Sequence, residues 1–269
     1  MDSFQIGPLA FPTALVVFVA AVMVALFAGK RIDRAHGRQV ETALWTILFV
    51  GVASARLAFL FIYWKSYAGN PWTVLDLRDG GFNIGVGVAG GLLMAGLLAF
   101  RSRVLRKPLA VSLASAAVLW TGLTLVLSAE DDTARLPPLA LANLDGKPVS
   151  IESFSGKPVV VNLWATWCPP CRREMPVFRQ AQQANKDITF VFANQGESPD
   201  SVRGFLDAEG LVLQNVLLDP GGNLAKAVGS VAMPTTLFYD RAGKLVGTRI
   251  GQVSEATLMQ RLQALREAP

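Results

Sequence analysis

The chain contains two cysteines, and both lie in the short segment Cys168-Pro169-Pro170-Cys171. If a helix begins here, one turn separates the two positions, so their sulfur atoms can come within disulfide distance. Cys168 would lie at the helix N-terminus, where free backbone N–H groups and the helix dipole favour a thiolate. We therefore expect Cys168 to be the nucleophile and Cys171, one turn further in, to be a buried resolving thiol.

A metal site and a structural disulfide both explain the cysteine pair less well than a nucleophile with its resolving thiol does. A structural zinc site commonly needs four ligands, but the chain has no third cysteine, and its single histidine, His36, lies in a distant segment. A purely structural disulfide would close a very small loop and would therefore constrain the unfolded chain very little. The segment thus predicts a redox-active pair that needs neither a metal nor a soluble cofactor.

The neighbouring residues predict how this pair is positioned. The apolar run Val159–Trp164 predicts a buried strand that leads through a short turn into Cys168, and a helix follows. Asp145-Gly146 predicts a hairpin within residues 139–151. Further strands are predicted at 188–193, 216–218, 235–239 and 245–250, and further helices at 199–209, 223–228 and, with Ser254 as its cap, up to about Arg266. Strands that alternate with helices predict an α/β sheet with helices on both faces.

The first half of the chain has a different composition. Hydrophobic residues make up 52% of the whole sequence, and four apolar runs of about 20 residues stand out at 9–28, 42–64, 82–100 and 109–128. Each is long enough to cross a bilayer as a helix. The sequence therefore predicts a multi-pass α-helical membrane domain of four spans at 1–128, a stiff polar linker at 129–137 and an α/β domain at 138–269.

The charges between these runs predict the topology. The connections 30–41 and 101–107 are rich in Lys and Arg, whereas in 65–81 two positive charges are offset by two negative ones. By the positive-inside rule the two basic connections face the cytoplasm, and the N-terminus and everything after residue 128 lie outside it. Residues 129–269 contain 14 Lys and Arg against 15 Asp and Glu, so no nucleic-acid partner is expected.

Two features of the spans have a structural and a functional interpretation. Gly81, Gly85, Gly87, Gly91 and Gly96 contain two GxxxG spacings, which favour close helix packing. Arg56 is a charge within a span, which is costly and is by default a functional hint; it could instead pair with a partner or reach the interface.

Segments of the first half resemble prolipoprotein diacylglyceryl transferases. The resemblance rests on residues 55–63 with Arg56, on Gly80-Gly81-Phe82 and on the glycine-rich third span. The family's histidine falls on Gly85 here, and the family's later signature and spans have no counterpart. The resemblance therefore implies an anchor or docking platform, with a lipoprotein diacylglyceryl transferase-like enzyme as an alternative.

The second half resembles the thioredoxin fold, and most closely the membrane-anchored TlpA-like branch that includes cytochrome c maturation thioredoxins. The resemblance rests on WCPPCRREMP, on VAMPTTLFYD and on Gly251. It implies that Cys168 attacks and Cys171 resolves, that Met233-Pro234 is a cis peptide bond, and that Met233, Pro234 and Trp167 form the substrate-binding groove. Trp164 and Trp167 are expected to pack around the thiols.

Glu174 is the expected proton acceptor for Cys171. It follows Cys171 by one helical turn and can face the same side, although a surface Glu is the alternative. The resemblance supports the buried position, because the TlpA-like branch places a buried glutamate there. Thioredoxin instead has an aspartate six residues before its first cysteine, where this chain has Asn162.

These expectations combine into one function, a periplasmic thiol–disulfide reductase anchored in a bacterial inner membrane. Its substrates would be disulfide-bearing periplasmic proteins. Because the spans contain no cysteine, a separate membrane electron donor is expected to re-reduce the pair. CPPC does not set the direction of electron flow, so a dithiol oxidase is an alternative, and a non-catalytic docking module is another.

Overall fold

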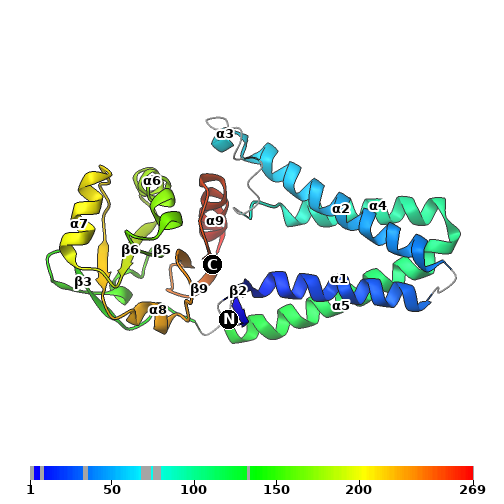
Figure 1. Ribbon diagram of the computed structural model, residues 1–269, viewed down its shortest axis with the longest axis horizontal. Coiled ribbons are helices and arrows are strands. Elements are labelled where there is room, and N and C mark those ends of the chain that lie inside the picture. The colour runs from blue at the N-terminus through cyan, green and yellow to red at the C-terminus, as the bar shows by residue number, and fades with distance from the viewer. Residues whose placement is uncertain are drawn as a thin grey trace. The chain divides into compact units, whose positions relative to one another are not determined.

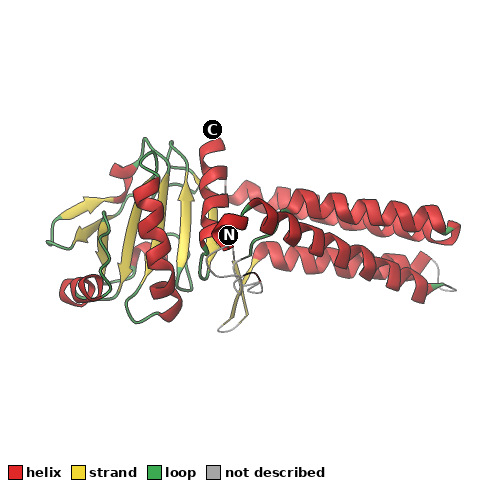
Figure 2. Cartoon of the chain, turned by 90° about the horizontal axis from the view of Figure 1, so that it is seen from above, coloured by secondary structure: helices red, strands yellow, loops and turns green. Residues whose placement is uncertain are grey.

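The computed structural model describes residues 3–6, 9–32, 36–67, 74, 80–131 and 134–268. The chain forms two compact units, Asp2–Ala129 and Glu130–Pro269 (Figure 1). The first unit consists mainly of helices, whereas the second combines helices with a sheet (Figure 2).

Four long helices make up most of the first unit, and each is long and apolar enough to cross a membrane. They are α1 (Thr13–Ile32), α2 (Gly37–Ile62), α4 (Ile84–Arg101) and α5 (Arg103–Asp131), together with the short α3 (Trp64–Tyr67). The four predicted helical segments are thus confirmed, although their ends differ. The first begins at Thr13 because Leu9–Pro12 (β2) pairs antiparallel with Ser3–Ile6 (β1). The last begins before Pro108, which lies inside α5.

Glycines allow α2 and α4 to pack closely. A methyl group added to Gly87 would lie 2.8 Å from the Cβ of Ala55 and 3.0 Å from the carbonyl oxygen of Gly51. One added to Gly90 would collide with the Ser54 side chain, whereas one added to Gly96 would meet open space. Close packing is therefore confirmed at Gly87 but not at Gly96, and Gly90 was not singled out from the sequence.

Arg56 is buried and donates hydrogen bonds to backbone carbonyl groups. Its Nη1 donates to the Gly81 oxygen and its Nη2 to the Val74 oxygen, each at 2.9 Å. Its guanidinium carbon lies 5.7–5.9 Å from the ring centres of Phe59, Tyr67 and Phe82. These contacts agree with the structural alternative for Arg56, because they tie the segment before α4 to α2.

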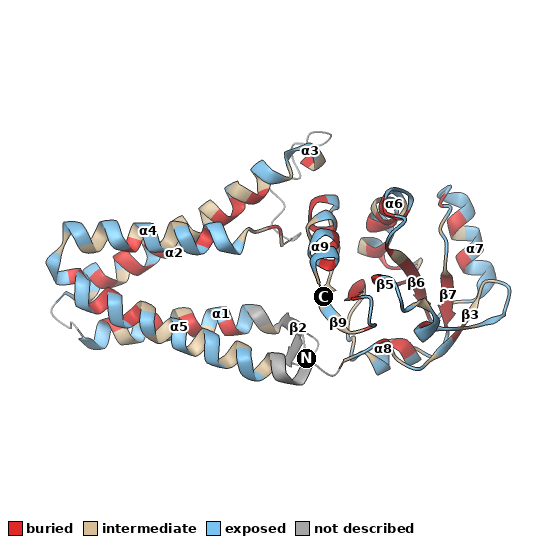
Figure 3. Ribbon diagram, turned by 180° about the vertical axis from the view of Figure 1, so that it is seen from behind, coloured by how far each residue is buried: buried red, intermediate tan, exposed pale blue. Residues whose placement is uncertain are grey.

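The second unit is built on one seven-stranded sheet with the order β4-β3-β7-β6-β5-β8-β9. Its strands are β3 (Ala140–Asn143), β4 (Pro148–Ser150), β5 (Val159–Trp164), β6 (Thr189–Gln195), β7 (Val216–Asp219), β8 (Thr235–Tyr239) and β9 (Leu245–Ile250). Strands β5, β6 and β7 are parallel, and β5 pairs antiparallel with β8. Figure 3 shows these central strands as buried.

Helices cover both faces of this sheet, as predicted. Apolar side chains of α6 (Pro169–Ala184), α7 (Pro199–Ala208) and α9 (Glu255–Glu267) pack with Val160 and Trp164 of β5 in one cluster. On the other face, Val159, Val161 and Leu163 pack with Leu224 of α8 (Asn223–Ala227) and with Ile151 of a short 3-10 helix, Ile151–Phe154. Side chains alternate along a strand, so β5 is buried on both faces.

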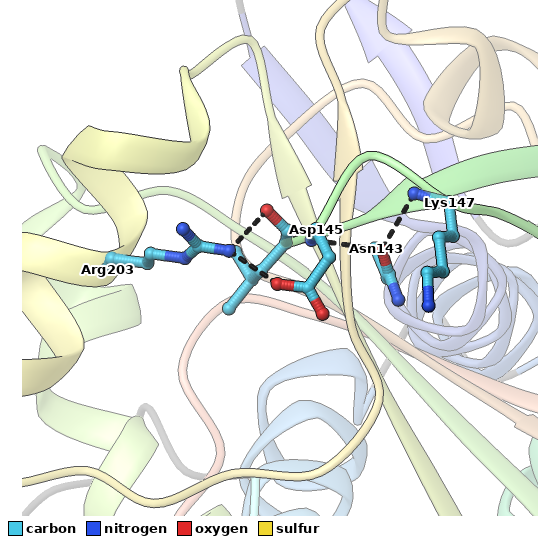
Figure 4. Close-up of polar contacts among 5 residues, drawn as sticks. Asn143, Asp145, Lys147 and Arg203 are labelled. Atoms are coloured by element: carbon cyan, nitrogen blue, oxygen red, sulfur yellow. Dashed lines mark hydrogen bonds and ion pairs between the residues drawn. The ribbon is translucent and has the colours of Figure 1, made fainter.

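The predicted hairpin joins β3 to β4 and is fixed by side chains (Figure 4). Asn143 Oδ1 accepts from the backbone N–H groups of Asp145 and Lys147, at 3.0 and 2.9 Å. Arg203 of α7 donates to the Leu144 carbonyl and to the Asp145 carboxylate, each at 2.7 Å. The hairpin is thereby attached to α7.

The predicted linker 129–137 differs from expectation at both ends. Helix α5 continues through Asp131. Beyond it, the Leu136 N–H donates to the Gly243 oxygen, and the Leu245 N–H donates to the Ala134 oxygen, each at 2.8 Å. The end of the linker therefore lies along the start of the edge strand β9, because backbone groups there were available for pairing.

Candidate functional site

The two cysteines form a disulfide at the start of α6. Their sulfur atoms are 2.10 Å apart and their Cα atoms 5.3 Å apart. Cys168 is the N-cap residue, and its Sγ accepts from the Cys171 N–H at 3.4 Å. Pro169 and Pro170 occupy the first positions of the helix, where a missing N–H costs nothing. The predicted position of Cys168 at the helix N-terminus is thus confirmed, and both cysteines are buried in this oxidised state.

The two tryptophans near the pair have different environments. Trp164 is fully buried in the cluster that includes both cysteines, and its ring lies 5.6 Å from the ring of Phe205. Trp167, next to Cys168, is 65% exposed. Trp164 thus packs with the two cysteines, whereas Trp167, in the turn after β5, leaves most of its ring exposed. An exposed apolar ring beside Cys168 is available to contact another polypeptide.

Met233-Pro234 is a cis peptide bond, as the resemblance implied. The register of β5 and β8 pairs Leu163 with Thr235, so Pro234 lies beside the end of β5 that leads to Cys168. Met233 packs against the cluster that contains the cysteines. Pro234 is buried, and its carbonyl oxygen accepts from the Gly251 N–H at 2.8 Å. Strand pairing therefore brings Met233 and Pro234 to the same end of the sheet as the disulfide.

Glu174 is fully buried on the inner side of α6, so the surface alternative is wrong. Its Oε1 accepts from Asn162 Nδ2 and its Oε2 from the Val253 N–H, each at 2.9 Å. Burial raises the pKa of the Glu174 carboxyl to about 8, although both hydrogen bonds and the charge of Arg249 act in the opposite direction. An acid with such a pKa can exchange a proton near neutral pH.

A second carboxylate supports the turn that leads to Cys168. Glu197 Oε2 accepts from the Thr166 N–H and from Asn194 Nδ2, each at 2.7 Å, and Oε1 accepts from the Thr166 hydroxyl at 2.5 Å. Sequence reasoning missed this contact. The signal in the sequence was that polar residues follow the ends of β5 and β6. Because these two strands are parallel and adjacent, their carboxyl ends lie at the same edge of the sheet.

These contacts define what the arrangement can do chemically. A disulfide at a helix N-terminus can be reduced to a thiolate and a thiol, since the free N–H groups there stabilise negative charge. A buried acid lies one helical turn from Cys171, and a buried proline and an exposed indole flank the pair. The site therefore suits exchange of a disulfide bond with another polypeptide.

Comparisons with known proteins divide the chain in the same two parts. Residues 129–262 match the model of the redoxin family, and residues 3–126 match the model of the prolipoprotein diacylglyceryl transferase family. The thioredoxin-like protein YneN of Bacillus subtilis (strain 168) is 32% identical over 130 residues, which cover 47% of this chain and 75% of the relative.

Two further matches concern the same region. The thiol-disulfide oxidoreductase ResA of Bacillus thuringiensis subsp. konkukian is 28% identical over 131 residues, which cover 48% of this chain and 75% of the relative. A crystal structure of a thiol:disulfide interchange protein of the thioredoxin family from Chlorobium tepidum is 28% identical. It covers 49% of this chain and 95% of its own, with a TM-score of 0.44.

Proposed function

Because the chain belongs to the redoxin family of thioredoxin-like proteins, we propose that it is a membrane-anchored reductase of protein disulfides outside the cytoplasm. Its general class is thiol–disulfide oxidoreductase, and the predicted fusion with a region similar to prolipoprotein diacylglyceryl transferases is confirmed. The disulfide at the N-terminus of α6 is the observation that carries the proposal.

The catalytic cycle begins with the reduced pair. The Cys168 thiolate attacks one sulfur of a substrate disulfide; a Cys168–substrate disulfide forms, and the other substrate sulfur leaves as a thiolate that takes up a proton. Cys171 loses its proton and attacks the Cys168 sulfur. The Cys168–Cys171 disulfide forms, the bond to the substrate breaks, and two electrons have moved from the pair to the substrate.

Glu174 is the proposed acceptor of the Cys171 proton. Both side chains are buried on α6, one turn apart, so solvent has little access to that proton. A carboxyl group whose pKa is raised to about 8 by burial can take up a proton near neutral pH, which suits it to receive the proton that Cys171 gives up.

Trp167, Met233 and Pro234 are the proposed contacts to the substrate polypeptide. They lie at the end of the sheet that holds the disulfide, and Trp167 offers apolar area to a bound chain. No metal or soluble cofactor takes part in this scheme, because the dithiol itself carries the electrons.

The four apolar helices are the proposed anchor in a bacterial inner membrane. Basic residues lie at the end of α1 and at the junction of α4 with α5, which supports a cytoplasmic position for these two turns and a periplasmic one for both termini. The chain's cysteines are both in the second unit. A separate membrane protein is therefore the proposed source of electrons for the periplasmic pair.

The test compares three forms of the full chain, reduced beforehand, in insulin disulfide reduction. The unmodified protein should reduce insulin, and Cys168→Ser should lose nearly all activity because no mixed disulfide can form. Cys171→Ala should accumulate the mixed disulfide, which also captures substrates in cells. Retention of full activity by Cys168→Ser would contradict the proposal.

The direction of electron flow needs its own measurement. A reduction potential below that of the substrate disulfides supports the reductase, since electrons move toward the couple of higher potential. A strongly oxidising potential, with formation of disulfides in reduced test proteins, would instead make the chain a dithiol oxidase.

A further inference from the structure

The pair formed by Asn162 and Glu174 contains a buried polar atom that has no part in the catalytic cycle. Asn162 Nδ2 donates to Glu174 Oε1 at 2.9 Å and to Thr236 Oγ1 at 3.1 Å. Its Oδ1 is buried too, and it has no hydrogen-bond partner among the residues that the structure describes. Because such an atom costs free energy, an acceptor kept without a donor needs a reason.

The two oxygens of Glu174 have different neighbours. Oε2 faces the backbone N–H of Val253, which can only donate. A proton on Oε2 that pointed at this N–H would place two donors against each other, so Oε1 is the more favourable position for the proton of a protonated Glu174. Oε1 faces the carboxamide of Asn162.

The same carboxamide must therefore meet two different partners. Toward an ionised carboxylate the amide nitrogen is the only suitable atom, since a carboxylate accepts and does not donate. Toward a protonated Oε1 whose hydrogen points at the amide, the nitrogen is unsuitable because it cannot accept, and an oxygen is the suitable partner. The unpaired Oδ1 is such an oxygen, and a half-turn of the amide exchanges the positions of nitrogen and oxygen.

We propose that Asn162 is a positioning residue whose carboxamide holds Glu174 in both protonation states, with Nδ2 donating to the ionised Oε1 and, after a half-turn of the amide, Oδ1 accepting from the protonated Oε1. Thr236 serves either orientation, because its hydroxyl can accept from nitrogen or donate to oxygen. The inference deepens the proposed function, since it rests on Glu174 taking the Cys171 proton.

The proton balance follows the second half of the cycle. Cys171 gives its proton to Oε1, the amide of Asn162 turns, and the Cys171 thiolate displaces the substrate sulfur from Cys168. The departing substrate thiolate takes up a proton from solvent. Glu174 returns its proton to solvent, and the amide turns back.

The other charged and titrating groups around Glu174 cannot bond to it in both protonation states, as Asn162 can. Arg249 of β9 favours the ionised carboxylate by its charge but cannot accept a proton from it. On α6 the titrating group next to Glu174 is Cys171, which is the proton source. Both forms of Glu174 occur near neutral pH, because burial raises its pKa to about 8.

The first test measures how fast the full chain releases a fluorescent peptide from a Cys168 mixed disulfide across a pH series. Asn162→Leu keeps the branched shape of the side chain but removes both polar atoms. The ionised carboxylate loses its donor, so the pH midpoint of release should rise by about 1 to 2 units. The matched control, Gln182→Met, removes another buried carboxamide, on α6, which bonds to the backbone of Gln214 instead, and it should leave the midpoint close to that of the unmodified chain.

The second test uses Glu174→Gln. In this variant the amide nitrogen takes the place of Oε1 and is a hydrogen-bond donor at every pH. An experimental structure of this variant should show Asn162 Oδ1 turned toward residue 174. Adding Asn162→Leu in this background should cause no further shift of the pH midpoint. A merely structural Asn162 would instead slow release equally in both backgrounds without moving either midpoint, and this result would overturn the inference.

The outcomes separate this inference from the proposed function. If the unmodified chain reduces disulfides but Asn162→Leu folds and leaves the midpoint unchanged, the inference alone is wrong. If the unmodified chain and Cys168→Ser are equally inactive, the proposed function is wrong, and the inference is overturned with it.

Discussion

Glu174 is a buried acid, and its ionised form lowers the stability of the oxidised fold. Burial raises its pKa from 4.5 to about 8, against two hydrogen bonds and the charge of Arg249. An unfolded chain would release this proton near pH 4.5, whereas the native chain keeps it until about pH 8. Between these values the native state binds more protons, so the contribution of Glu174 to stability falls as the pH rises.

Glu174→Gln should therefore remove this loss of stability. Relative to the unmodified chain, the variant should gain more stability at pH 9 than at pH 5, by a few kcal/mol. Denaturation midpoints of the oxidised proteins at both pH values check the sign. Glu209→Gln, at an exposed position on the end of α7, is the control and should show the same difference between the two pH values as the unmodified chain. The comparison is the stability of Glu174→Gln minus that of the unmodified chain. A smaller value at pH 9 than at pH 5 would contradict this account of the carboxyl group.

At the scale of elements, the closeness of α2 and α4 depends on glycines on one face of α4. Gly87 and Gly90 lie against Ala55 and Ser54, where any side chain would have to displace helix backbone or side chains. In a membrane, apolar side chains gain little by moving from lipid into the protein, so close packing supplies much of the helix association. Gly96, on the same helix, faces open space and does not share this role.

Gly87→Leu should therefore destabilise the first unit by about 1 to 3 kcal/mol, because the two helices must move apart. Gly96→Leu is the matched control on the same helix and should cause a much smaller loss. Unfolding in mixed detergent micelles, followed by tryptophan fluorescence, measures both. Equal losses for the two variants would contradict the packing account, because a leucine at position 96 meets open space.

At the scale of the whole molecule, the four apolar helices of the described residues and the charges at their ends predict a topology. The ends of α1 and α4 carry Lys30, Arg31 and Arg101, and α5 begins with further basic residues. Together with an even number of candidate spans, this pattern predicts that both chain ends lie outside the cytoplasm.

A reporter fused after Pro269 tests the topology. Alkaline phosphatase, which needs an oxidising compartment to fold, should be active in this position. A reporter that fluoresces only in the cytoplasm should be dark there and bright when fused within the junction of α4 and α5. The opposite pattern would place the redox site in the cytoplasm and would contradict the proposed location.

Local patterns in the sequence were sufficient for several conclusions. The cysteine spacing, the apolar run before it and Asp145-Gly146 predict the disulfide, β5 and the hairpin between β3 and β4, because each depends on neighbours in the chain. Length and hydropathy predict the four long helices for the same reason. Their ends were less predictable, since α1 begins only where β2 ends, and pairing with β1 determines that position.

Only the tertiary structure decided which groups surround the redox pair. The two donors to Glu174 are 12 and 79 residues away from it in the chain. Thr166 and Glu197, which bond to each other, are 31 residues apart. The exposure of Trp167 and the burial of Glu174 likewise depend on how strands pair and on which face of α6 meets the sheet. The sequence by itself determined a closely spaced cysteine pair on a strand–helix turn, behind four apolar segments. Non-local packing determined the acid–amide pair beneath it, because hydrogen bonds between distant segments depend on sheet register and helix docking, which no local pattern contains.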